Sequence, residues 1–181
     1  MLAPLIRMID RIAVVLGVVA MAALVVLVVA MLYEVAARYV FNQPTLWAFD
    51  ISYMLNGALF YLAAAYALKS NAHVRIDFLS ARLPERAQVW INAFFFLALF
   101  LPVMTLLSWV GVQKAWRAWV TGEVEAVSPW APLMWPFLSA IALGMVALTL
   151  QILAEALRLA ATGRMPAPDE HTAPPQPGAG A

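Results

Sequence analysis

The side chains that could carry chemistry are concentrated in one stretch, residues 33–57, YEVAARYVFNQPTLWAFDISYMLNG. It contains two carboxylates, Glu34 and Asp50, one guanidinium, Arg38, and the amide of Asn56. Glu34 and Arg38 are four residues apart, so on a helix they share one face and can form an ion pair. The side chains of this stretch can therefore form ion pairs and hydrogen bonds.

None of the known catalytic arrangements is present in the sequence. The apolar runs contain no Ser/His pair, no HExxH motif, no phosphate-binding glycine loop and no carboxylate cluster. The absence of cysteine excludes disulfides and thiolate chemistry. Only two histidines occur, His73 and His171, and the second lies in a polar tail, so paired haem ligands are not expected. We expect no enzymatic activity, no metal site and no cofactor in this chain.

The composition predicts an integral membrane protein. Hydrophobic residues make up 65% and charged residues 12% of the 181 residues, whereas soluble domains have about 25% charged residues. The mean hydropathy is +0.84. A net charge of +1 does not favour a nucleic-acid partner, so the expected environment is the lipid bilayer.

The apolar runs predict an all-α membrane protein with four transmembrane helices and short interfacial helical segments, because a span needs about 20 residues. The first run exceeds the apolar core of about 7 to 15 residues of a cleaved signal peptide, so we expect it to be retained. The tail is rich in Pro and Gly and should be disordered. The predicted organisation is a terminus at 1–11, a membrane domain at 12–158 with spans at about 12–33, 47–68, 89–112 and 133–154, and a tail at 159–181.

Several residues predict where helices end or bend. Asn42, Gln43 and Pro44 should break the first helix, with Thr45 as N-cap of the second and Asp50 in its first turns, where the helix dipole favours an acid. Pro102 should kink the third span. Gly122 is a natural C-terminal stop.

Two sets of residues leave alternatives open. Asn56 beside Gly57 should lie on a helix-facing side, either within this protein's own bundle or against another subunit, because an unpaired amide is costly in hydrocarbon. Five of the seven tryptophans flank the third connection. They indicate an interfacial aromatic belt rather than a substrate cage.

The basic connection 69–88 should lie on the membrane surface.

Counting basic side chains on alternating sides of the membrane predicts the orientation. Eight of them lie on the side of the termini and three on the other: Arg7, Arg11, Lys69, Arg75, Arg82, Arg86, Arg158 and Arg164, against Arg38, Lys114 and Arg117. Positive charge accumulates in the cytoplasm. Both termini should therefore be cytoplasmic, with the opening stretch, 33–57, and the Trp-rich third connection, 123–136, outside.

Three motifs in order carry a resemblance to a known family. They are EVAARYVFNQPTLWAFDISYMLNGALFYLAAAYAL, NAHVRID and TGEVEAVSPWAPLMWP. The chain resembles, from about residue 12 to 158, the small membrane subunit (DctQ-type) of tripartite ATP-independent periplasmic (TRAP) transporters. Its Trp/Pro-rich third connection is most similar to the mannitol/chloroaromatic branch, some members of which carry 2-oxo acids.

The resemblance implies a scaffold subunit in the bacterial inner membrane. Its partners would be a large elevator-type membrane subunit (DctM-type), which holds the sodium and substrate sites, and a periplasmic binding protein that delivers carboxylate-type solutes. Asp50 stands where the family often has Glu, and Ala142 where a Pro is common. The resemblance implies, by motif position, partner-interface or docking roles for Arg38, Asn42, Pro44, Trp47, Asp50, His73, Arg75, Asp77, Glu123, Ser128, Pro129 and Trp130. Glu34 and Asn56 are expected at such surfaces from the ion pair and the buried amide described above.

Two other functions are considered beside this one. A membrane anchor of a quinone- or haem-linked respiratory complex would also be a small helical subunit, but the missing histidine pair argues against it. A free-standing structural or assembly protein would need no large partner.

The orientation can be tested with a reporter fused after Ala181. We expect a reporter that functions only in the cytoplasm to be active there, since eight of eleven counted basic residues lie on the side of the termini. A periplasm-specific reporter at the same position serves as the control. Activity of the periplasmic reporter would contradict the predicted orientation.

Overall fold

The computed structural model describes residues 2–70, 91 and 94–162, and within this part the fold is all-helical. It consists of α1 (Leu2–Tyr39), α2 (Ala48–Lys69), η1 (Phe95–Phe100), α5 (Leu101–Thr121) and α6 (Trp135–Thr162). Four helices, with η1 and α5 counted as one, are long and apolar enough to cross a membrane. The predicted all-α class with four spans is therefore confirmed. The surface segment predicted at 69–88, from residue 71 on, and the tail from 163 lie outside the described residues.

The helical conformation is interrupted between α1 and α2, around the predicted break at residues 42–44. After α1 the backbone N–H groups of Val40 and Gln43 bond to the carbonyls of Ala36 and Ala37, both at 2.9 Å. Asn42 has a φ of 52°, a left-handed conformation that Asn tolerates better than most residues. The prediction of Thr45 as N-cap is wrong. Helix α2 begins at Ala48 and its N-cap, Trp47, makes no side-chain capping bond.

Pro102 is accommodated by a π-helical segment. The residues before it, η1, are wound more loosely, and the N–H of Leu101 bonds to the carbonyl of Phe96, five residues back. Proline has no N–H and its ring clashes with the carbonyl four residues before it, so an extra residue in the preceding turn relieves both problems. The structure shows a change of winding before this proline, and the predicted kink stays a prediction. At the other end of α5, Gly122 has a φ of 62° and ends the helix as predicted.

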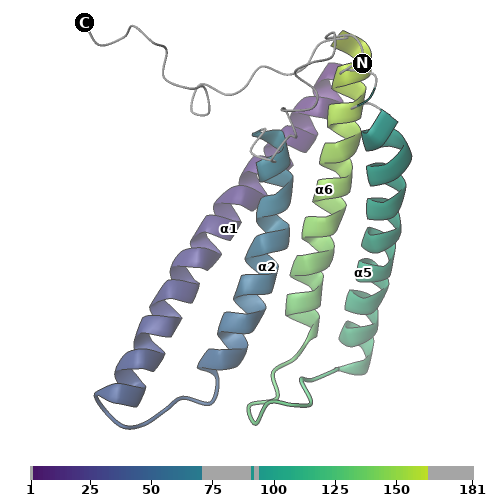
Figure 1. The fold of residues 1–181 in the computed structure, drawn as a ribbon. Coiled ribbons are helices and arrows are strands. Elements are labelled where there is room, and N and C mark those ends of the chain that lie inside the picture. The colour runs from purple at the N-terminus through teal and green to yellow at the C-terminus, as the bar shows by residue number, and fades with distance from the viewer. Residues whose placement is uncertain (1, 71–90, 92–93, 163–181) are drawn as a thin grey trace, which may run out of the picture.

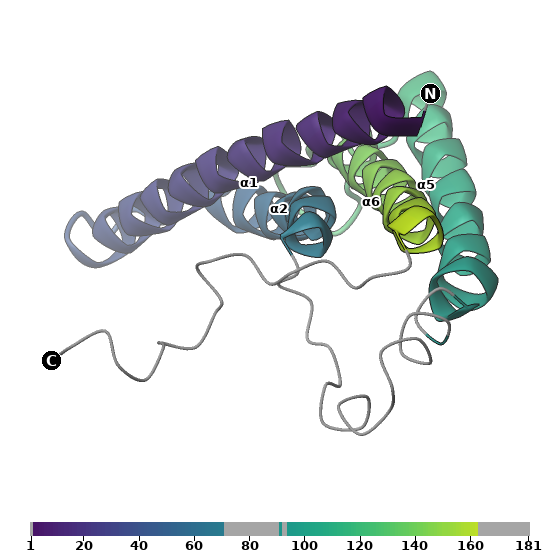
Figure 2. The same cartoon turned by 90° about the horizontal axis from the view of Figure 1, so that it is seen from above.

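The four helices lie side by side in an open layer. Helices α2 and α6 lie in the middle, with α1 beside α2 and α5 beside α6 (Figures 1 and 2). The buried cluster is made largely of small residues from α1, α2 and α6: Ala13, Leu16, Ala20, Leu62, Ala65 and Ala147. Small side chains allow close helix approach, which matters in lipid because apolar burial gives little driving force there.

Close packing between α2 and α6 depends on two glycines. A Cβ placed on Gly144 would lie 2.5 Å from the carbonyl carbon of Tyr61, and one on Gly57 would lie 2.8 Å from a ring carbon of Phe137. The first contact is with backbone, which cannot move without displacing α2. Gly57 therefore serves the protein's own helix packing.

Gly144→Ala should weaken the packing of α2 on α6 by about 1–3 kcal/mol, the usual cost of overpacking. The measurement is the thermal unfolding of the purified subunit in detergent. Gly111→Ala is the matched control, because its Cβ would meet the flexible side chain of Met145 at 3.2 Å. Equal melting temperatures of the two variants would show that the α2–α6 approach does not limit stability.

Candidate functional site

Both short connections lie at the same end of the molecule. Residues 40–47 join α1 to α2, and residues 122–134 join α5 to α6 (Figure 1). We call this the loop end. The opposite end is formed by the start of α1 and the end of α6 (Figure 1). The charged side chains that the structure describes lie toward these two ends.

At the loop end, Glu34 ties the end of α1 to the following connection. One carboxylate oxygen accepts hydrogen bonds from Nε and Nη2 of Arg38, at 3.0 and 2.6 Å. The other accepts from the backbone N–H of Thr45 at 3.0 Å and from its hydroxyl. Both oxygens of this buried side chain are thus occupied. The predicted Glu34–Arg38 pair is confirmed, and Thr45 has a role that sequence reasoning missed.

An aromatic stack continues this connection. Trp47 and Tyr33 stack with ring centroids 5.8 Å apart and an interplanar angle of 23°. Asn42 and Pro44 stay exposed. The connection is therefore fixed to α1 by the hydrogen bonds of Thr45 to Glu34 and by a ring contact, while Asn42 and Pro44 stay on its exposed side.

A second polar contact joins the α5–α6 connection to the start of α2. The hydroxyl of Ser128, in the α5–α6 connection, donates to the carboxylate of Asp50 in the first turn of α2. The same oxygen of Ser128 accepts the N–H of Trp130 at 3.1 Å. Asp50 is buried. Residues from the first and third sequence motifs, 78 positions apart, therefore meet at one point.

Backbone bonds give the connection 122–134 its shape. Val124 and Leu133 form an antiparallel bridge, and the N–H of Met134 bonds to the carbonyl of Glu123 at 2.9 Å. Pro129 and Trp130 are exposed at the turn that this bridge closes. Glu123 is also exposed and contributes only backbone bonds here.

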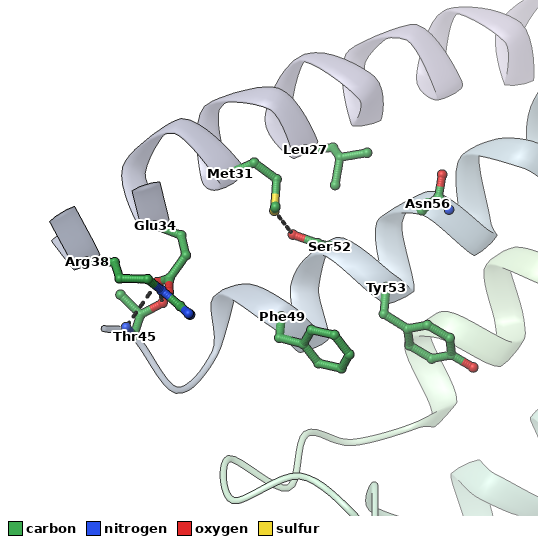
Figure 3. Close-up of a pocket in the computed structure, with 9 residues that line it drawn as sticks. All are labelled: Leu27, Met31, Glu34, Arg38, Thr45, Phe49, Ser52, Tyr53 and Asn56. Carbon is green, nitrogen blue, oxygen red and sulfur yellow. Dashed lines mark hydrogen bonds and ion pairs between the residues drawn. The ribbon is translucent and has the colours of Figure 1, made fainter. Parts of the chain in front are cut away.

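A groove of about 500 Å³ runs between α1 and α2 (Figure 3). Glu34, Arg38 and Thr45 lie at one end, and Leu27 and Asn56 lie at the other. The remaining lining residues are Met31, Phe49, Ser52 and Tyr53. The groove is therefore mostly apolar, with a polar end and an isolated amide.

Asn56 differs from the other predicted residues. The sequence predicts a helix-facing amide with a partner, but within this chain Asn56 is exposed and has no hydrogen bond to another described side chain or backbone group. Its neighbour Gly57 faces α6 instead. Adjacent residues on a helix point in different directions, which explains the difference.

Sequence reasoning missed a buried polar cluster at the opposite end. Gln151 donates to Asp10 at 3.1 Å and to Glu155 at 3.3 Å. Arg158 bonds Glu155 at 2.7 Å and also pairs with Asp10. The spacing of four and three residues along α6 puts the three side chains on one face, which was the available signal. The partner Asp10 lies on α1 and was not predictable from spacing.

This cluster fastens α1 to α6 inside the apolar layer. Gln151 is fully buried and Glu155 is 4% exposed. Breaking a buried ion pair by removing one partner leaves a charge uncompensated, so the cluster constrains how the two helices align. We assign it a structural role.

The predicted residues that the structure describes divide into internally bonded and exposed side chains. Among residues 2–70, 91 and 94–162, no group of three or more His, Asp or Glu side chains could hold a metal ion. The carboxylates of Glu34 and Asp50 are occupied by internal hydrogen bonds. The predicted positions His73, Arg75 and Asp77 lie outside the described residues. What the loop end presents outward is Arg38, Asn42, Pro44, Pro129 and Trp130.

Comparison with known proteins gives a family and two relatives. The family model for the DctQ component of tripartite ATP-independent periplasmic transporters matches residues 27–162. The sialic acid TRAP transporter small permease protein SiaQ of Vibrio cholerae is 28% identical over 91 residues, which are 50% of this chain and 52% of SiaQ. The sialic acid TRAP transporter permease protein SiaT of Haemophilus influenzae is 27% identical over 74 residues, 41% of this chain and 12% of SiaT. The matches thus span about half of the first relative and a small part of the second.

Ser128→Ala should lower the free energy of unfolding by about 1–3 kcal/mol, because it removes a donor from the buried Asp50 carboxylate. Thermal unfolding and limited proteolysis of the 122–134 connection in detergent would measure this. Val127→Ala is the control in the same connection, since Val127 is 91% exposed. Similar proteolysis of both variants would contradict a stabilising role for the Ser128–Asp50 contact.

Proposed function

Because the chain belongs to the DctQ family of tripartite ATP-independent periplasmic transporters, we propose that it is the small scaffold subunit of a binding-protein-dependent secondary importer. It is a multi-pass inner-membrane protein. The observation that carries the proposal is the family match over residues 27–162, which includes both loop-end connections and parts of all four spans. The match does not favour a respiratory anchor.

The proposed partners are a large permease subunit and a periplasmic binding protein. The similarity to part of the permease protein SiaT supports the first, because a segment like this chain occurs there within a much longer permease. The second follows from the transporter class. We propose that both termini are cytoplasmic, so that the loop end faces the periplasm, and that its exposed Arg38, Trp130 and Pro129 contribute to docking.

The distribution of polar groups supports a scaffold role over a substrate site. Each ion pair that the structure shows among residues 2–70, 91 and 94–162 lies toward a helix end. Between the ends, Ser108 and Thr149 bond each other at 2.9 Å and so serve packing of α5 on α6. A transported anion and its coupling ions need several polar groups near the midplane. We therefore place sodium and substrate binding in the large subunit.

The substrate is proposed to be a carboxylate, in line with the resemblance to the mannitol/chloroaromatic branch, some members of which carry 2-oxo acids. Coupling to sodium is part of the same proposal. For His73, Arg75 and Asp77, a role at a partner interface rests on the family motif.

Reconstitution into vesicles tests this function. We expect sodium-driven uptake of a 2-oxo acid only when this chain, the large subunit and the binding protein are all present, because each supplies a different part of the transporter. Vesicles lacking this chain should fall to the level of empty vesicles. Uptake at full rate from the large subunit and binding protein alone would overturn the scaffold proposal. Equal uptake with potassium in place of sodium would remove the sodium coupling only.

A further inference from the structure

Asn56 places an exposed amide inside an apolar part of α2. It lies eight positions after the first residue of the helix, Ala48, which corresponds to a distance of about 12 Å along the axis at 1.5 Å per residue. The hydrocarbon region is about 30 Å thick. Asn56 therefore lies well inside the helix and not at its polar boundary.

Nothing described in this chain pairs with that amide. The nearest hydroxyl along the same face, Ser52, donates to the carbonyl of Ala48 at 2.7 Å and contacts the sulfur of Met31 at 2.8 Å. Across the groove, α1 offers the apolar side chains of Leu27 and Met31 (Figure 3). Within the described part of the chain, Asn56 is thus left without a hydrogen bond.

An unpaired amide facing hydrocarbon is unfavourable by several kcal/mol. A lipid acyl chain in the groove could not relieve this cost, because it has no donor or acceptor. A lipid headgroup at the Glu34–Arg38 end of the groove would not reach Asn56, which lies at the other end. A protein helix can bring a polar side chain to this depth, and it would also cover the exposed Met31, Phe49 and Tyr53.

We propose that a transmembrane helix of the large permease subunit lies in the α1–α2 groove and hydrogen-bonds Asn56. This inference rests on the proposed function. The contacting group is the side chain of a Ser, Thr, Asn or Gln residue, or a backbone carbonyl left free at a helix break, since each can form a hydrogen bond with an amide. The groove carries a neutralised ion pair at its outer end, so the partner helix needs no compensating charge there.

Asn56→Leu tests the hydrogen bond directly. We expect the affinity of the purified chain for its large subunit, measured in nanodiscs, to fall about 3- to 30-fold, the range that interhelical hydrogen bonds give in membranes. The melting temperature of the isolated chain should stay the same or rise, because an exposed amide is removed. Thr105→Leu is the matched control: its hydroxyl is exposed on α5 and bonds only its own helix, at the carbonyl of Leu101.

Cross-linking locates the occupant of the groove. The chain has no cysteine, so Leu27→Cys and Val25→Cys each introduce a single thiol for a photoactivatable label. Leu27 lines the groove, while Val25 is 62% exposed on another face of α1. We expect the label at position 27, in the complete transporter, to capture the large subunit more efficiently than the label at 25.

The outcomes separate this inference from the proposed function. If the wild-type chain does not bind the large subunit, the proposed function fails. If it binds but Asn56→Leu and Thr105→Leu bind equally well, the groove inference alone fails. Capture of a lipid or of a second copy of this chain at position 27 would likewise overturn it.

Discussion

The absence of water in the hydrocarbon region is the constraint on which this structure depends. In lipid a polar group must be satisfied inside the protein or by another protein. Glu34 is satisfied inside the protein: its two oxygens accept hydrogen bonds from Arg38 and Thr45. The carboxylate at the end of α1 therefore holds the following connection in place. Asp50 is likewise satisfied through Ser128. These bonds hold the loop end in one shape.

Apolar side chains contribute to helix association in this chain through close contact rather than through burial from water. Because lipid is as apolar as the side chains, helix association relies on close contact, and Gly144 provides it at the backbone of Tyr61. The result is an arrangement in which α2 and α6 lie in the middle, α1 packs on both of them and α5 packs on α6 (Figure 2). An open layer leaves much apolar surface for lipid and for a partner subunit, in line with a scaffold.

The sequence predicted those features that depend on local chemistry. Span number follows from apolar length, the Glu34–Arg38 pair from a spacing of four, and the end of α5 from Gly122, whose φ of 62° suits glycine. Contacts between distant residues were not predictable, because spacing says nothing about which helices become neighbours. Asp50 with Ser128 and Gln151 with Asp10 are such contacts. Thr45 was predicted as the N-cap of the second helix, but its hydroxyl bonds Glu34 on α1 instead, a contact that spacing does not reveal.

The stretch from Tyr33 to Gly57 therefore contains two kinds of polar residue with different consequences. Glu34 and Asp50 have internal partners and determine the shape of the loop end. Asn56 has none among the described residues, although it lies deeper in the helix, where an unpaired amide is least tolerated. A membrane subunit that works alone would gain stability by replacing it with an apolar residue. Its presence is best explained by a second protein, and the same reasoning identifies partner-facing residues in other small membrane subunits: they are the polar groups that their own chain leaves unpaired.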